Sequence, residues 1–296
     1  MRFALTASLS LLAFSALGFV TANPQQLASR QGPNTIYSDY PLQQTAAANI
    51  TSWLVPITKA QASKLVGGRT LLPPKGLPAG FFLKKDQHLM LILAGYYSDV
   101  RQLNVISIPQ MSFLHMYIPW VQAVANSQTP FLYAKGQKHY QTYLSQIIPA
   151  LAGNLLQSAN AKPAFFDPPH AAYKAIASDL SFNVDVGLLD NTIDGPGLTS
   201  PVFISTFRPS KSAAFSVEFM QSVMQQPFIR TDTKNTCTKK EFRYNETFAD
   251  TFRVRGNLQT GADLTQSHLS FADAQGISGT AEWILPSEGS PCTYFA

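Results

Sequence analysis

The chain has 296 residues, of which 45% are hydrophobic and 13% are charged, and its formal net charge is +5. This length suits one large domain or two small ones, and the apolar content is sufficient for a core. The basic residues are scattered, and the densest stretch, Lys234 to Arg243, also contains Glu241, so we expect no nucleic-acid partner.

Residues 1–22 have the pattern of a cleavable signal peptide. Arg2 precedes an apolar run from Phe3 to Val20, and small residues follow as far as Ala22. Small residues also dilute the run itself, which disfavours a membrane anchor. No later segment reaches the roughly 18 uninterrupted apolar residues of a membrane span. We therefore expect cleavage after Ala22, a secreted extracellular protein and no membrane partner.

The next segment, residues 23–48, contains many Gln, Ala, Ser, Asn and Pro residues and few large apolar ones. This composition predicts a mobile leader outside the core. Residues 49–296 show neither an internal repeat nor a linker, so we predict that they form a single domain.

Most of this domain is predicted to be β-structure. Thr58 and Gln61 have the spacing of a capping box, which predicts a short helix that ends before Gly67. Pro109 and Pro119 are expected to limit two of the strands. Apolar or alternating runs predict strands at residues 50–56, 89–94, 103–108, 113–120, 180–189, 202–207, 241–255, 264–271 and 277–284.

Two further segments have helical periodicity. Residues 140–159 carry apolar side chains at helical spacing and are interrupted by Pro149, which predicts two short helices or one kinked helix. Phe215, Phe219 and Val223 recur every four residues and predict a helix packed on the core. The predicted fold class is α+β, in which a curved antiparallel β-sheet is closed into a barrel-like core with two or three short helices.

Covalent features are expected at four positions. Cys237 and Cys292 are the only cysteines, and in an oxidising compartment they are expected to form one disulfide. They lack the paired spacing of a zinc site. Asn49 and Asn245 each begin an Asn-x-Thr sequon, so we expect glycosylation at the surface there.

Several catalytic motifs do not occur in the sequence. They are Gly-x-Ser-x-Gly, the phosphate loop, Gly-x-Gly-x-x-Gly and His-Glu-x-x-His, which argues against serine hydrolases, nucleotide enzymes and zinc proteases. The five histidines are widely separated and do not propose a metal site. We expect no metal and no cofactor.

One continuous region resembles a known family. A strand, a short helix and Leu71-Leu72-Pro73-Pro74 precede an apolar strand that leads into Tyr97-Ser98-Asp99. This order, over about residues 51–131, resembles the acetoacetate decarboxylase superfamily, and more closely its secreted fungal branch. The resemblance implies a cone-shaped β-barrel and a buried lysine that forms an imine with a keto group, so that no cofactor is needed.

The resemblance also implies roles for individual residues. The family's lysine motif matches Tyr133-Ala134-Lys135, and its glutamate context matches Tyr97-Ser98-Asp99. Lys135 would be the nucleophile, Asp99 the general acid or base, and Arg101 or Arg69 the group that binds the substrate carboxylate. The chain departs from the family at Gly136, where a second lysine is expected, and the family's early arginine has no counterpart near Asn49 to Trp53.

Two functions remain open from the sequence. One is a lyase that acts on a small keto acid or polyketide-like compound through an imine on Lys135. The other is a non-catalytic extracellular glycoprotein that binds an apolar small ligand or a wall component, and the departures from the family favour it. Lys135 also fits a solvated loop, and Asp99 and Arg101 also fit a surface ion pair. In both cases the partner is a small organic acid or apolar ligand, and the oligomeric state is left open.

Overall fold

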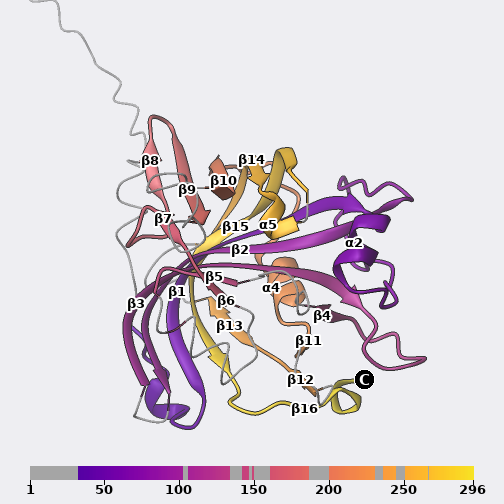
Figure 1. The fold of residues 1–296 in the computed structure, drawn as a ribbon, viewed down its shortest axis with the longest axis horizontal. Helices are drawn as coiled ribbons and strands as arrows, with labels where there is room; N and C mark the ends of the chain where they lie inside the picture. The colour runs from indigo at the N-terminus through magenta and orange to yellow at the C-terminus, as the bar shows by residue number, and fades with distance from the viewer. Residues whose placement is uncertain are drawn as a thin grey trace, which may run out of the picture.

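A computed structural model describes residues 33–102, 106–133, 142–146, 149, 161–186, 200–230, 236–244, 251–265 and 267–296. Strands predominate among these residues (Figure 1). The helices are α2 (Lys59–Leu65), α4 (Val217–Met224) and the single turn α5 (Ala262–Thr265), with 3-10 turns η1 (Tyr37–Asp39) and η3 (Cys292–Phe295). The strands are β1 (Gln44–Thr58), β2 (Gln87–Gln102), β3 (Ile106–Val121), β4 (Phe131–Tyr133), β5 (Thr142–Leu144), β6 (Ala161–Pro163), β7 (Phe165–Asp167), β8 (Lys174–Ile176), β9 (Asp179–Val186), β10 (Ser200–Pro209), β11 (Phe228–Ile229), β12 (Thr236–Thr238), β13 (Glu241–Tyr244), β14 (Phe252–Thr260), β15 (Leu269–Leu285) and β16 (Ser290–Pro291).

The sheet is curved and open. Its described strands follow the order β16-β12-β11-β4-β3-β2-β1-β15-β14-β10-β9-β7, with β5, β6, β8 and β13 attached beside this path. Figure 1 shows the long strands β1, β2 and β3 bending together, with α4 on the inner side of the bend. The predicted closure into a barrel is wrong for the described strands. Strands of only two or three residues, β16 and β7, form the two ends, and they offer few hydrogen bonds for closure.

The long central strands are buried on both faces. In β1, Trp53, Val55 and Ile57 belong to one apolar cluster, whereas Ile50 and Leu54 belong to another. Because successive side chains of a strand point to opposite faces, these clusters lie on opposite sides of the sheet. We name them the α2 side and the α4 side, after the helix that packs in each cluster.

Both helices that the sequence predicts near residues 58 and 220 are present. The side chain of Thr58 accepts from the backbone of Gln61 at 3.1 Å, and the Gln61 side chain accepts in return from the Thr58 backbone at 2.9 Å. The capping box is therefore confirmed. Gly67 and Gly68 follow with positive φ, as expected after a helix. In α4 the cap is Ser216.

The predicted mobile leader extends too far along the chain. From residue 33 onward the segment is described, and β1 begins at Gln44, inside the predicted leader. Thr35 donates from its backbone nitrogen and its hydroxyl to the buried carboxylate of Glu282, at 2.7 and 2.6 Å. The small alanines of residues 46–48 are buried because they fit between β2 and β15. Their small size explains why these three alanines, which resemble part of a polar leader in the sequence, lie in the core.

Three other sequence predictions differ from the structure. Residues 142–144 form β5, which pairs with β3, although helical spacing had predicted a helix there; most of residues 147–160 lie outside the described part. Residues 262–265 form α5, so β15 begins only at Leu269. Pro109 and Pro119 lie inside β3, not at its limits. They are tolerated because Pro109 faces the irregularity at Asp99 and Pro119 lies in a register shift.

The predicted disulfide between Cys237 and Cys292 is confirmed, and it ties β12 to η3. Within the described residues, no helix combines the length and the apolar character needed to cross a bilayer.

Candidate functional site

Asp99 and Arg101 form an ion pair. Arg101 Nε lies 2.6 Å from Asp99 Oδ1, and the two side chains are 40% and 32% exposed. The Arg101 guanidinium also lies 4.7 Å from the ring centroid of Tyr37. The hydrogen bond and charge of Asp99 raise the pKa of Arg101 above its ordinary value. The two charges thus compensate each other. The catalytic role of Asp99 and the carboxylate-binding role of Arg101 stay predictions.

The other predicted site residues do not join this pair within the described structure. Arg69 lies with its guanidinium 5.3 Å from the ring centroid of Tyr133, near the end of β3. Arg101 pairs with Ser107 at the opposite end of that strand. The structure therefore separates the two arginines. Lys135 lies outside the described residues.

The prediction that the Asn49 sequon lies at the surface is wrong. Asn49 is 3% exposed and lies in the centre of β1, paired with Tyr96 on one side and Thr280 on the other. A central strand leaves no room for a glycan on such a side chain. Asn245 lies outside the described residues, so its glycosylation stays a prediction.

A group of aromatic and basic side chains gathers on the α4 side of the sheet. Alternate residues of a strand share a face, so Phe113, His115 and Tyr117 of β3 lie on the same face as Tyr97 of β2. Strand β15 adds a tryptophan, and the segment between β12 and β13 adds a lysine. This aromatic–lysine cluster consists of Tyr97, Phe113, His115, Tyr117, Lys240 and Trp283.

His115 is held at both ring nitrogens. Its Nδ1 lies 3.0 Å from the Thr142 hydroxyl of β5, and its Nε2 lies 3.3 Å from the Tyr97 hydroxyl. The Tyr97 ring stacks on Phe113 with centroids 3.9 Å apart. These contacts fix the imidazole in one orientation inside an apolar surrounding.

Lys240 is the cationic member of the cluster. Its amine donates to the Tyr117 hydroxyl at 2.9 Å and lies 5.3, 5.2 and 6.0 Å from the ring centroids of Tyr117, Phe228 and Trp283. Such contacts stabilise an ammonium group through the negative faces of the rings. No carboxylate among the described residues lies within ion-pair distance of this amine, and neighbouring Glu241 pairs instead with Arg243.

Burial sets the charge of the cluster. Desolvation, aided by the charge of Lys240, lowers the pKa of His115 well below its ordinary value. Desolvation likewise raises the pKa of Tyr97 well above its ordinary value, and nearby Tyr117 adds to this effect. At neutral pH both groups are therefore uncharged, and the positive charge of the cluster resides on Lys240.

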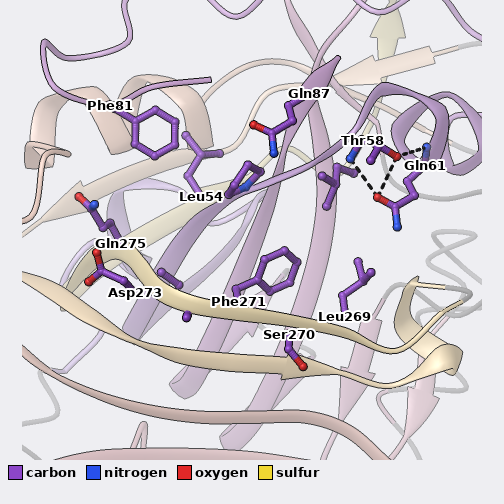
Figure 2. A pocket seen from close by; sticks show the side chains of 14 residues that line it. Leu54, Thr58, Gln61, Phe81, Gln87, Leu269, Ser270, Phe271, Asp273 and Gln275 are labelled. Atoms are coloured by element: carbon purple, nitrogen blue, oxygen red, sulfur yellow. Dashed lines mark hydrogen bonds between the residues drawn. The ribbon is translucent and has the colours of Figure 1, made fainter. Parts of the chain in front are cut away.

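A second candidate site is a pocket of about 420 Å³ between the end of β1, α2 and the start of β15 (Figure 2). Its volume lies within the roughly 300–1,000 Å³ that is usual for small-molecule sites. Apolar side chains and glutamine amides line it, together with one carboxylate. The lining residues are Leu54, Pro56, Ile57, Thr58, Gln61, Phe81, Gln87, Leu269, Ser270, Phe271, Ala272, Asp273, Ala274 and Gln275.

Sequence reasoning did not single out His115, Tyr117 or Lys240. The alternation within residues 113–117 was a usable signal for one aromatic face. Nothing local indicates that Lys240 meets Tyr117, because 123 residues separate them. Within the described residues, no group of three His, Cys, Asp or Glu side chains is arranged to hold a metal ion.

Comparison with known proteins informs the fold. No protein-family model matches the sequence, and no curated protein matches it. Among solved structures, the chain is similar to an acetoacetate decarboxylase-like enzyme from Sphingomonas wittichii RW1, with 8% sequence identity, 84% of this chain and 92% of that chain covered, and a TM-score of 0.51. It is also similar to the enduracididine biosynthesis enzyme MppR, with 10% identity, coverage of 84% and 87%, and a TM-score of 0.47. At such identity the first likeness establishes the fold alone.

Proposed function

We propose that this chain, which has an acetoacetate decarboxylase-like fold, binds a small organic acid at the aromatic–lysine cluster. The observation that carries the proposal is the position of the Lys240 amine among three rings, with one hydroxyl partner. An ammonium group has three donors, and only one of them is used within the described residues, so two remain for a carboxylate. Burial strengthens such a charge-assisted bond.

The rest of the cluster supplies the apolar half of this site. Tyr97, Phe113 and Trp283 pack together beside Lys240, with the Tyr97 and Trp283 centroids 5.3 Å apart. These packed rings make the surroundings of the Lys240 amine apolar, which suits the hydrocarbon portion of a small acid. Uncharged His115 adds no second cation, so the site favours one carboxylate over a dianion.

A second candidate is a lyase that works through a lysine imine, favoured by the proton-transfer groups His115 and Tyr117 near a lysine amine. Lys135 or Lys240, when uncharged, would attack a keto carbon, and loss of water would give the iminium ion. That ion would accept the electron pair released as carbon dioxide leaves. Protonation of the enamine carbon and hydrolysis would restore the lysine and release the ketone.

Isothermal titration of the protein with acetoacetate, other β-keto acids and matched alkanoic acids tests the proposal. We expect Lys240→Met to weaken acid binding about tenfold or more, because a charged hydrogen bond contributes roughly 1.5–3 kcal/mol. The exposed neighbour in Lys239→Met is the matched control. Unchanged affinity in Lys240→Met would overturn the proposed site.

Borohydride treatment followed by peptide mass analysis separates the two candidates. An adduct on Lys135 or Lys240 that forms only with keto acids supports the lyase. Binding of keto and non-keto acids alike, with no adduct on any lysine, supports a binding protein.

We also propose that the chain is exported. The signal-like pattern of residues 1–22 and the Cys237–Cys292 disulfide support this proposal. N-terminal sequencing of the protein from culture medium should begin at Asn23. Retention in the cells with Met1 still present would contradict export.

A further inference from the structure

The pocket between α2 and β15 is separate from the aromatic–lysine cluster, because the two share no lining residue. Gln87, at the start of β2, lines the pocket, whereas Tyr97, near the end of the strand, belongs to the cluster. A ligand of this pocket is therefore a different molecule, or a different part of one, from the acid proposed above.

Three glutamine side chains are preset as hydrogen-bond donors. Their Oε1 atoms each accept from a backbone N–H: at 2.9 Å for Gln61, 3.1 Å for Gln87 and 2.6 Å for Gln275. An amide whose oxygen accepts from the backbone keeps both N–H donors of its NH₂ group for other acceptors. Within the described residues these NH₂ groups donate to no protein acceptor, so they are available to acceptors of a ligand.

The acceptor Asp273 and the ring of Phe271 lie at a bulge in β15, whereas Phe81 lies in the segment before β2. The register between β14 and β15 shifts between Gly256 and Leu258, and Asp273 has φ +57 there. Its carboxylate stays 60% exposed, with Arg255 Nη1 at 3.4 Å. Bulges re-aim side chains and recur beside functional sites. Figure 2 shows the Gln87 amide and the Phe271 ring on opposite sides of the pocket.

The residues that line the pocket indicate which chemical class of ligand it suits. No Lys, Arg or His lines the pocket, which disfavours an anionic ligand, and the charge of Asp273 is already matched by Arg255. Amide donors, a carboxylate acceptor and the half-buried rings of Phe81 and Phe271 remain. A pyranose has hydroxyl groups that can bond to the amides and the carboxylate, and an apolar C–H face that can pack on the phenylalanine rings.

From this arrangement we propose that the pocket binds a neutral carbohydrate, with a sugar ring against Phe271 and its hydroxyls on the glutamine amides and Asp273. Gln61 and Thr58 place one of these donors directly on the cap of α2. Sugar recognition is therefore coupled to the local fold of that helix.

Saturation-transfer NMR and titration with short cello-, chito- and β-1,3-gluco-oligosaccharides test this inference. Gln87→Glu and Gln275→Glu retain the oxygen that accepts from the backbone but replace the NH₂ donor, so both should weaken sugar binding about tenfold while the fold persists. Gln102→Glu, at the other end of β2, is the matched control. Phe271→Leu should reduce saturation of the sugar C–H protons.

Several outcomes would overturn the inference. They are absence of binding to every neutral sugar at millimolar concentration, equal weakening in Gln102→Glu, or unchanged affinity in Gln87→Glu, Gln275→Glu and Phe271→Leu. Because Lys240 is not in this pocket, Lys240→Met should leave sugar binding unchanged. This control separates failure of the carbohydrate site from failure of the proposed acid site.

Discussion

His115 shows how one buried side chain can set a property of the whole cluster. The imidazole is 8% exposed, contacts Thr142 and Tyr97 through its nitrogens, and lies near Lys240. A charged imidazole there would lose hydration and be repelled by the lysine. The folded protein therefore binds a proton at His115 only well below the ordinary pKa.

We predict that His115 makes stability fall as the pH drops below about 6.5, the ordinary histidine pKa. Between the folded pKa and this value the unfolded chain binds more protons, so the free energy of unfolding rises with pH. His115→Gln should reduce this slope, by at most about 1.4 kcal/mol per pH unit. Urea unfolding from pH 5 to 8 measures it.

His88 needs a separate control, because burial lowers its pKa as well. Adding His88→Gln should further reduce the slope that remains in His115→Gln. If His115→Gln keeps the wild-type dependence of the free energy of unfolding on pH, His115 is not its source.

At the scale of elements, two glycines allow close approach to β1. A Cβ on Gly95 of β2 would lie 2.1 Å from the Asn49 carbonyl oxygen, and a Cβ on Gly276 of β15 would lie 1.9 Å from the Ser52 carbonyl oxygen. Such contacts are impossible, so β1 is bordered on both sides by positions that require glycine. Glycines at these points permit the bend of the long strands.

We predict that Gly95→Ala lowers the free energy of unfolding by about 2–3 kcal/mol, because the backbone of β1 must shift. Gly68→Ala is the comparison: nothing lies within 4 Å of its Cβ, but its φ is +80°. That variant should lose only about 1–2 kcal/mol. Denaturant unfolding, with equal m-values for the two variants, shows which substitution costs more stability. Equal losses would contradict the prediction, because they would mean that the backbone relieves the steric contact at Gly95.

The sequence predicted elements best where the signal is local. Thr58 and Gln61 lie one helical turn apart, so the cap of α2 depends on neighbours alone and was confirmed. β5 was mistaken for a helix because its identity depends on pairing with residues 113–115 of β3. Pro109 was expected to end a strand, but the irregularity opposite it in β2 accommodates the ring.

At the scale of the whole molecule, features that depend on local sequence were again easier to predict than features that depend on distant contacts. The acetoacetate decarboxylase-like fold was predicted from a continuous region of about residues 51–131, which contains β1, β2 and β3. The structural likeness confirmed this fold, whereas the predicted closure into a barrel was wrong. The candidate sites were not predicted, because each combines residues from strands that are distant in sequence. Lys240 meets Tyr117 across 123 residues, and Gln275 meets the backbone of Ala214 across 61. Only the assembled sheet brings such groups together.

The Cys237–Cys292 disulfide lies near one of the two candidate sites, the aromatic–lysine cluster. Cys237 and Cys292 are both buried, and Lys240 follows Cys237 by a few residues. The bridge closes a loop with a sequence separation of 55. The chain-entropy account gives such a loop roughly 3–4 kcal/mol of stability, and the same constraint limits where Lys240 can lie.

We therefore predict that replacing both cysteines with serine has unequal effects on the two sites. The free energy of unfolding should fall by roughly 3–4 kcal/mol. Acid affinity at Lys240 should weaken, because β12 is released from η3. Sugar affinity between α2 and β15 should stay within about twofold, because no lining residue of the pocket belongs to β12, β16 or η3. Denaturant unfolding and parallel titrations measure all three. Equal loss of both affinities would show that the bridge supports the fold as a whole and does not specifically position Lys240.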